Sequence, residues 1–295
     1  MPEPTPLSPE VKAQRAGSFG DAASHYERYR PGPPVEAVDW VIPGHLHTVV
    51  DLGAGTGALT RLLVRKADEV MAVEPDDRMR AVLTEAVPGA RALAGRGESL
   101  PLPDGSVDAV LASSSWHWMD PIPTLNEIAR VLVPGGTLAA MWSGPDPDAG
   151  LIAQAAALLG GDGDGDVVGD AATAGPPDDS APSAASDMGI DDASRSELAE
   201  AIKDRNALPQ ELVIPEGVPF DQPEQTSITW NVALNADELI GLLGTFSWVI
   251  LMEDAARERL LATARRVLRE SLGVSGDMTV DIRYRAEVFK ARRHG

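Results

Sequence analysis

The chain has 295 residues, of which 43% are hydrophobic, and it contains no cysteine, which excludes disulfides, thiolate metal ligands and a cysteine nucleophile. Its formal net charge is -20, so nucleic acid, whose binding needs a concentrated basic surface, is not an expected partner. No apolar run reaches the ~18 residues of a membrane span, and we therefore expect a cytoplasmic protein with no membrane partner.

The N-terminal region predicts a tail followed by a possible pocket cover. Residues 1–18 read as flexible, and residues 19–31 then combine aromatic and arginine side chains, among them Tyr26 and Arg30, before a Pro-Gly-Pro-Pro stop. This segment could cap a ligand pocket, although tyrosines of a surface helix packed on the core would give the same pattern. Residues 35–42 predict a short helix that leads into the first strand.

The most informative stretch is a strand followed by a glycine loop at residues 49–57. Apolar residues end the strand, glycines at 53, 55 and 57 force a tight turn, and residues 58–63 resume with helical spacing. Glycines let the backbone approach a ligand, and a helix start offers unpaired N–H groups, so a nucleotide-like ligand is expected. The loop also satisfies the dinucleotide pattern G-x-G-x-x-A, which keeps an NAD-dependent oxidoreductase as an alternative.

A second strand, residues 69–74, ends in an acid. Glu74 lies about 20 residues beyond the glycine loop, where a carboxylate can bind both hydroxyls of a ribose. The helix that follows Pro75 has an apolar face that begins with Met79. A carboxylate that only satisfies the N–H groups of this helix start would give the same pattern.

Two further strands, residues 91–95 and 107–112, are separated by a loop that contains Gly97 and Glu98. The second of them runs into a polar and aromatic segment, residues 113–121, and ligands of open α/β sheets bind beyond such carboxyl ends. In this segment Trp116 and Trp118 could shape a pocket or attract a cation, but tryptophans that only fill a core are an equal alternative.

The order of these motifs resembles that of the class I S-adenosylmethionine-dependent methyltransferases. The resemblance covers residues 19–142 and rests on the glycine loop with Asp51, on Glu74, on residues 98–108 beside the adenine and on residues 132–138 before the fifth strand. A dinucleotide enzyme predicts neither of the last two motifs. The resemblance implies a Rossmann-like α/β fold, a doubly wound and mostly parallel seven-stranded sheet in the order 3-2-1-4-5-7-6, with S-adenosyl-L-methionine as cofactor.

The resemblance also assigns residues to a site. The expected cofactor contacts are Tyr26, Arg30, Asp51, Gly53, Ala54, Gly55, Gly57, Glu74, Pro75, Met79, Gly97, Glu98 and Ser113. Residues 26–31 and 115–120 resemble the branch that includes trans-aconitate methyltransferases, which implies a small-molecule acceptor. The expected acceptor contacts are Trp116, His117, Trp118, Trp142 and Trp248.

Methyl transfer from a sulfonium needs few special residues, because alignment and exclusion of water supply much of the rate. A carboxylate acceptor is already a nucleophile, whereas a hydroxyl needs a base. His117, the expected catalytic residue, would either orient a carboxylate as a hydrogen-bond donor or act as a base, unless it only packs between two tryptophans. We expect O-methylation of a carboxylate or hydroxyl, with a non-catalytic cofactor-binding protein as a further alternative.

The domain organisation follows from where the core pattern stops and resumes. We expect a tail at 1–18, a cofactor-binding core with an N-terminal lid at 19–144, a cap at 145–225 and the rest of the core sheet at 226–295. Within the cap, residues 160–193 hold nine aspartates and no lysine or arginine and are expected to be disordered. The aspartates at 162, 164 and 166 lack the glycine and glutamate of a calcium loop, so no metal is expected.

Overall fold

A computed structural model describes residues 29, 31–146, 211–245, 247–250, 252–270, 273 and 276–295. The expected tail, the residues Tyr26 and Arg30, and the acidic segment 160–193 lie outside the described residues. Among the helices in the described ranges, none is both long and apolar enough to cross a membrane.

Seven strands form one sheet in the order β3-β2-β1-β4-β5-β7-β6, which confirms the expected order. The strands are β1 Leu46–Leu52, β2 Ala67–Val73, β3 Arg91–Leu93, β4 Val107–Ser113, β5 Leu132–Pro145, β6 Glu224–Asn235 and β7 Thr279–Arg292. The first five strands are parallel to one another, and β7 runs antiparallel to both β5 and β6. The fold is therefore the expected doubly wound, mostly parallel α/β sheet.

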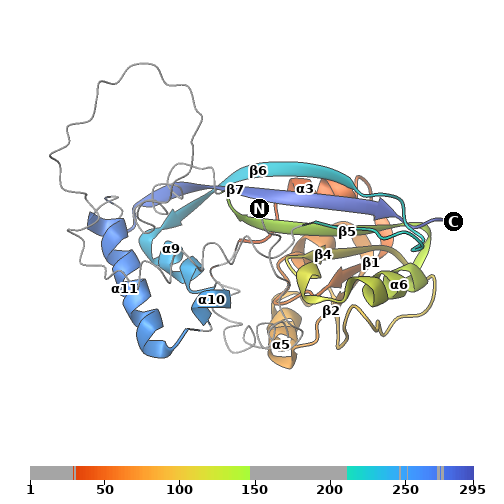
Figure 1. Ribbon diagram of the computed structural model, residues 1–295, viewed down its shortest axis with the longest axis horizontal. Helices are drawn as coiled ribbons and strands as arrows, with labels where there is room; N and C mark the ends of the chain where they lie inside the picture. Colours follow the sequence, from red (N-terminus) through yellow and green to blue (C-terminus); the bar gives the residue numbers. More distant parts are fainter. Residues whose placement is uncertain are drawn as a thin grey trace, which may run out of the picture.

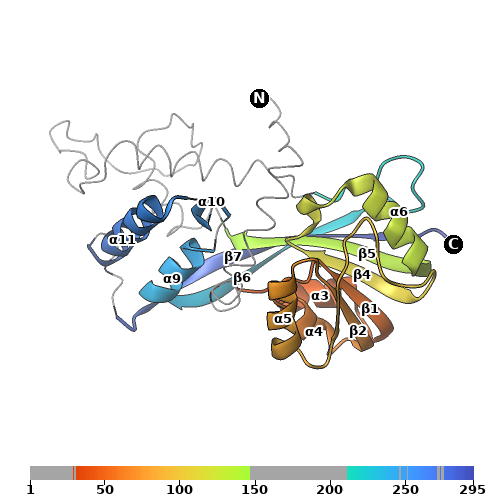
Figure 2. The same ribbon diagram turned by 90° about the horizontal axis from the view of Figure 1, so that it is seen from below.

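Helices cover both faces of the sheet. They are α3 Val35–Val41, α4 Thr60–Leu63, α5 Asp77–Ala86, the 3-10 turn η1 Trp116–Trp118, α6 Pro121–Val131, α9 Ala236–Leu243, α10 Ser247–Ile250 and α11 Asp254–Glu270. In Figure 2, α3, α4 and α5 lie on one side of the sheet and α6 lies on the other. Figure 1 shows β6 and β7 extending beyond the shorter parallel strands toward α9 and α11.

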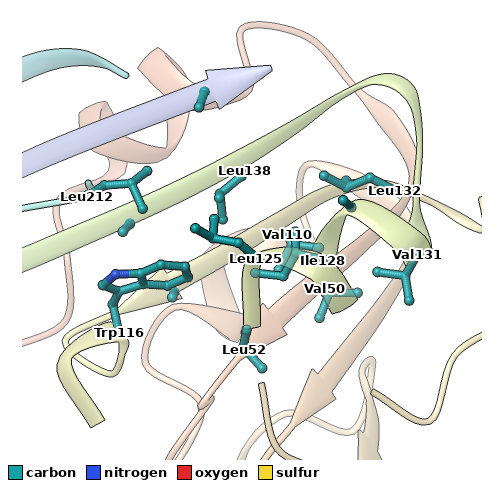
Figure 3. Packing of buried hydrophobic residues seen from close by; sticks show 14 of the residues in the cluster. Val50, Leu52, Val110, Trp116, Leu125, Ile128, Val131, Leu132, Leu138 and Leu212 are labelled. Carbon is teal, nitrogen blue, oxygen red and sulfur yellow. The ribbon is translucent and has the colours of Figure 1, made fainter. Parts of the chain in front are cut away.

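The larger core cluster lies between the sheet and α6, as Figure 3 shows for Val50, Val110, Leu125 and Ile128. Parallel strands with helices on both faces bury both sets of side chains, which explains their near-continuous apolar sequences. On the other face, α3 and α4 pack on the sheet in a second cluster that includes Val38, Leu63 and Val49.

The stretch before β6 belongs to the core rather than to the cap that was expected to reach residue 225. Leu212, Ile214 and Phe220 are buried in the cluster beneath α6, and β6 begins at Glu224. Sequence reasoning missed this because Leu212-Val213-Ile214 is too short a run to show a period, and prolines, a glutamate and a glycine separate it from Phe220. Of the expected cap, the described residues therefore include only its two ends, and the second end packs into the core.

The C-terminal part begins with a capped helix. The Asn235 side chain accepts from the Glu238 N–H at 3.0 Å while the Glu238 carboxylate accepts from the Asn235 N–H at 2.9 Å, which is the reciprocal capping box. Leu242 of α9 packs with Tyr284 of β7 in a separate cluster, so α9 is fixed on the long antiparallel pair.

Candidate functional site

The glycine loop after β1 is built from three residues with left-handed backbone. Gly53, Gly55 and Gly57 have φ values of 69°, 57° and 97°. Gly53 and Gly57 are also required by packing, because a Cβ would lie 2.5 Å from Ser115 Cβ at the first and 2.9 Å from Val87 Cγ2 at the second. At Gly55 the nearest atom would be Met79 Sδ at 3.7 Å, so this backbone alone of the three is left open to a ligand.

A strained turn after β4 holds the glycine loop from the other side. Ser114 is the one non-glycine residue of the described part with positive φ, at 53°, and its N–H donates to Met141 O at 2.8 Å. Such a conformation costs about 1–3 kcal/mol and is concentrated at functional sites. The turn brings Ser115 against Gly53, where its buried hydroxyl donates to Leu52 O at 2.7 Å. The ends of β1 and β4 are thereby locked together.

Glu74 follows β2 and closes the glycine loop. Its side chain is largely buried, Oε2 accepts from the Gly55 N–H at 2.9 Å, and Oε1 accepts from the Asp76 N–H at 2.9 Å. Burial raises the pKa of this carboxyl, and the two backbone donors act in the opposite direction. Each carboxylate oxygen has two lone pairs, so both can still accept a ligand hydroxyl.

Asp51, at the end of β1, supplies a second buried carboxylate. The Thr60 hydroxyl donates to Oδ2 at 2.6 Å, but Oδ1 is buried with no hydrogen-bond partner among the described residues. The pKa of Asp51 is raised to about 7, chiefly by burial and also by the nearby Glu74 charge, while the hydrogen bonds from Thr60 act in the opposite direction. An orphaned acceptor beside a glycine loop suits a cationic or hydrogen-bond-donating group of a ligand.

Asp51→Asn is expected to remove a pH dependence of stability. Because the folded-state pKa of about 7 lies above the ordinary 3.8, the folded protein holds the proton that the unfolded chain loses, and stability falls as pH rises toward 7. Between pH 5 and pH 8, the free energy of unfolding of the variant should rise by about 3 kcal/mol relative to that of the parent. Urea denaturation across this range measures it, with exposed Asp281→Asn as control. If the difference in free energy of unfolding between parent and variant stays constant with pH, the titration of Asp51 is not the cause of the pH dependence.

The loop between β3 and β4 is held by α6. A Cβ at Gly97 would lie 2.7 Å from Met119 Sδ, and Glu98 Oε1 accepts from the Asp120 N–H at 2.8 Å. Arg130 of α6 donates to Leu102 O at 2.8 Å and to Asp104 at 2.7 Å. The predicted adenine contacts therefore have fixed backbone positions, and one oxygen of Glu98 is already used by the start of α6.

The aromatic segment at the end of β4 divides between core and surface. Trp116 is buried in the cluster beneath α6, as Figure 3 shows, while His117 and Trp118 are half-buried with ring centroids 4.6 Å apart. The indole Nε1 of Trp142, on β5, donates to His117 Nδ1 at 3.1 Å. The structure thus brings together three of the predicted acceptor contacts, Trp118, His117 and Trp142, whereas Trp116 is buried as a core residue in the same cluster as Trp142. Trp248 lies on α10, outside the described side chains.

The sequence predicted that the N-terminal segment could cover the pocket, but it did not predict the contacts of this segment with Ala58 and with α9. A Cβ at Gly32 would lie 3.3 Å from Ala58 Cβ, directly after the glycine loop, and a Cβ at Gly241 of α9 would lie 2.4 Å from Tyr29 Cδ1. Tyr29 therefore lies against α9, and Gly32 lies beside the end of the glycine loop, shortly before α3. The signal was the Gly-Pro-Pro run, which predicts a break in a helix but not the close approach that Gly32 permits.

Comparison with known proteins gives consistent matches. Residues 50–140 match a family model described as a methyltransferase domain. The chain is 35% identical over 251 residues to a methyltransferase of Mycobacterium tuberculosis, with 85% of each protein covered. It is 33% identical over 148 residues to a methyltransferase-like protein of Schizosaccharomyces pombe, which covers 48% of this chain and 58% of that protein.

Among solved structures, a type II methyltransferase from Anaeromyxobacter dehalogenans superposes with a TM-score of 0.55. The sequences are 22% identical, and the match covers 90% of this chain and 98% of the other. At this identity the likeness shows the fold alone.

Proposed function

Since this chain belongs to the class I S-adenosylmethionine-dependent methyltransferases, we propose that it transfers the methyl group to an oxygen of a small molecule, a carboxylate or a hydroxyl. The proposal is carried by the hydrogen-bonded pair of His117, beyond the end of β4, and Trp142, in the last part of β5, near the sheet edge that also bears the glycine loop. The imidazole of His117 is a single hydrogen-bonding group that lies among aromatic side chains. Such a site suits a small acceptor that has one polar group to be oriented.

The residues around the glycine loop fit the cofactor. We assign the open backbone of Gly55 to close contact with it, the two oxygens of Glu74 to the ribose hydroxyls, and the orphaned Oδ1 of Asp51 to its cationic end. These assignments follow from the chemistry of the donors and acceptors, because a buried carboxylate oxygen without a partner is costly unless a ligand supplies one. Tyr26 and Arg30 remain expected contacts from the N-terminal side.

Bound S-adenosylmethionine supplies a methyl group on a sulfonium, so that the C–S bond breaks as the new O–C bond forms and a neutral thioether leaves. The chain's own residues align the acceptor and exclude water, which together can supply much of the acceleration. Half-buried Trp118 and the His117 ring would form one wall of the acceptor site. Residues 26–31 and 115–120 resemble the small-molecule branch that includes trans-aconitate methyltransferases, which supports a small acceptor.

The test is transfer of isotope from methyl-labelled S-adenosylmethionine to matched panels of acids, alcohols and amines. Labelled ester from a carboxylic acid or labelled ether from an alcohol is the expected result. Product only from amines, or only with an added protein, would overturn the proposal. Micromolar cofactor binding with no product from any panel would favour the alternative of a non-catalytic cofactor-binding protein.

A further inference from the structure

We propose that Trp142 is a positioning residue that holds His117 as the neutral ring with its proton on Nε2, so that His117 donates a hydrogen bond to the acceptor and does not remove a proton from it. The inference rests on the proposed function and narrows the chemical class of the methyl acceptor. Because His117 then offers a donor and not a base, it suits an acceptor that already carries an ionised oxygen, a carboxylate.

The tautomer follows from the direction of one hydrogen bond. Indole Nε1 carries a hydrogen and can only donate, so Nδ1 of His117, 3.1 Å away, must present its lone pair. A neutral imidazole has one ring proton, which is then on Nε2. The choice that the sequence left open between donor and base is thereby decided in favour of the donor.

The indole is held too firmly to release Nδ1. Trp142 and Trp116 are each 5% exposed, and the Trp142 ring packs edge-on against Phe289 of β7 with centroids 5.8 Å apart. Trp142 lies on β5, which pairs with β4 on one side and with β7 on the other. A buried side chain on a central strand cannot turn away without leaving a void, which would cost several kcal/mol.

The imidazole is fixed from its own side as well. Ser115, two residues earlier, is anchored to Leu52 O, and the His117 ring lies against Trp118. Protonation of Nδ1 would set two N–H donors against each other, so the indole opposes the cationic ring that a general base becomes. A charge-assisted bond from Nε2 to one carboxylate oxygen would orient the acceptor and leave the second oxygen to attack the methyl carbon.

The first test reads the tautomer directly by nitrogen-15 NMR of protein labelled in histidine, with the His117 signals assigned by their loss in His117→Gln. We expect an unprotonated Nδ1 and a protonated Nε2 in the parent protein, and loss of this fixed pattern in Trp142→Phe. Trp116→Phe removes an equally buried indole from the same cluster and should leave the His117 signals in place. A proton on Nδ1 in the parent, or no change in Trp142→Phe, would overturn the proposal.

This readout needs no acceptor, so it separates the inference from the proposed function. If the tautomer is as expected and neither an acid nor an alcohol is methylated, the proposed function fails while the positioning role of Trp142 stands. Labelled ether from an alcohol with no ester from any acid would leave the proposed function in place and overturn the carboxylate assignment.

Activity supplies the second test once an acid is methylated. Glutamine can donate from its amide but cannot act as a base, so His117→Gln should lower kcat/KM less than tenfold, whereas His117→Leu should lower it a hundredfold or more. Loss of a general base typically costs about 10²–10⁴-fold. A loss of that size in His117→Gln, with unchanged cofactor affinity, would show that His117 is the base.

Discussion

Gly53→Ala is expected to lower the free energy of unfolding by about 4 kcal/mol, from backbone strain and a steric clash together. The backbone at this position has φ of 69°, which alanine adopts only with strain. The new methyl group would lie 2.5 Å from Ser115 Cβ and 2.8 Å from its Oγ, so Ser115 must move and its buried bond to Leu52 O must break. Urea denaturation measures the loss.

Two companion variants separate the contributions. Gly55 also has a positive φ, but a Cβ there would have no atom nearer than Met79 Sδ at 3.7 Å. Gly55→Ala should therefore lower the free energy of unfolding by only about 1 kcal/mol. Its affinity for the cofactor should nevertheless fall. Adding Ser115→Gly to Gly53→Ala removes the clashing atoms and should restore part of the stability. Equal losses in Gly53→Ala and Gly55→Ala would show that the contact with Ser115 is unimportant.

Glu74→Ala is expected to weaken binding of S-adenosylmethionine by about 100-fold or more. A hydrogen bond to a charged group contributes about 1.5–3 kcal/mol, and two ribose hydroxyls would lose their acceptor. The variant also leaves the N–H groups of Gly55 and Asp76 without the carboxylate that holds the loop closed. Isothermal titration calorimetry with S-adenosylmethionine and S-adenosylhomocysteine measures the change.

The role of Glu74 at the ribose can be distinguished from its role in the loop. The same titrations are repeated with the 2′-deoxy analogue of the cofactor, which lacks one of the two hydroxyls. If Glu74 binds the ribose, the variant should lose at least tenfold more affinity for the natural cofactor than for the analogue. Equal losses for both ligands would mean that Glu74 acts only by holding the glycine loop.

The glycine loop and the short strands around it were predictable from the sequence because their signals are local, whereas the strand order was implied by the resemblance to the methyltransferases. Three alternating glycines, an acid at the end of the next strand and short apolar runs each occupy a few consecutive residues. Their positions after β1 and β2 follow from the topology, since the ends of parallel strands meet at one edge.

The contacts between distant residues could not be predicted in this way. Trp116 and Trp142 are equally plausible pocket residues in the sequence. The indole of Trp142 reaches hydrogen-bond distance of His117 only because β5 pairs with β4. The engagement of Glu98 by the start of α6 likewise depends on how a loop packs on a helix 22 residues further along the chain. Tertiary packing, which no local pattern encodes, decides these roles.

The position of β7 between β5 and β6 has a consequence for synthesis on the ribosome. β6 is made before β7, which is its one partner among the strands that the structure describes, and β7 begins 44 residues after β6 ends. At a translation rate of about 5–20 residues per second, β6 and the free edge of β5 stay unpaired for several seconds until β7 has been synthesised. During that interval two open strand edges face other nascent chains, so slowed translation of residues 236–278 should increase aggregation of the newly made protein.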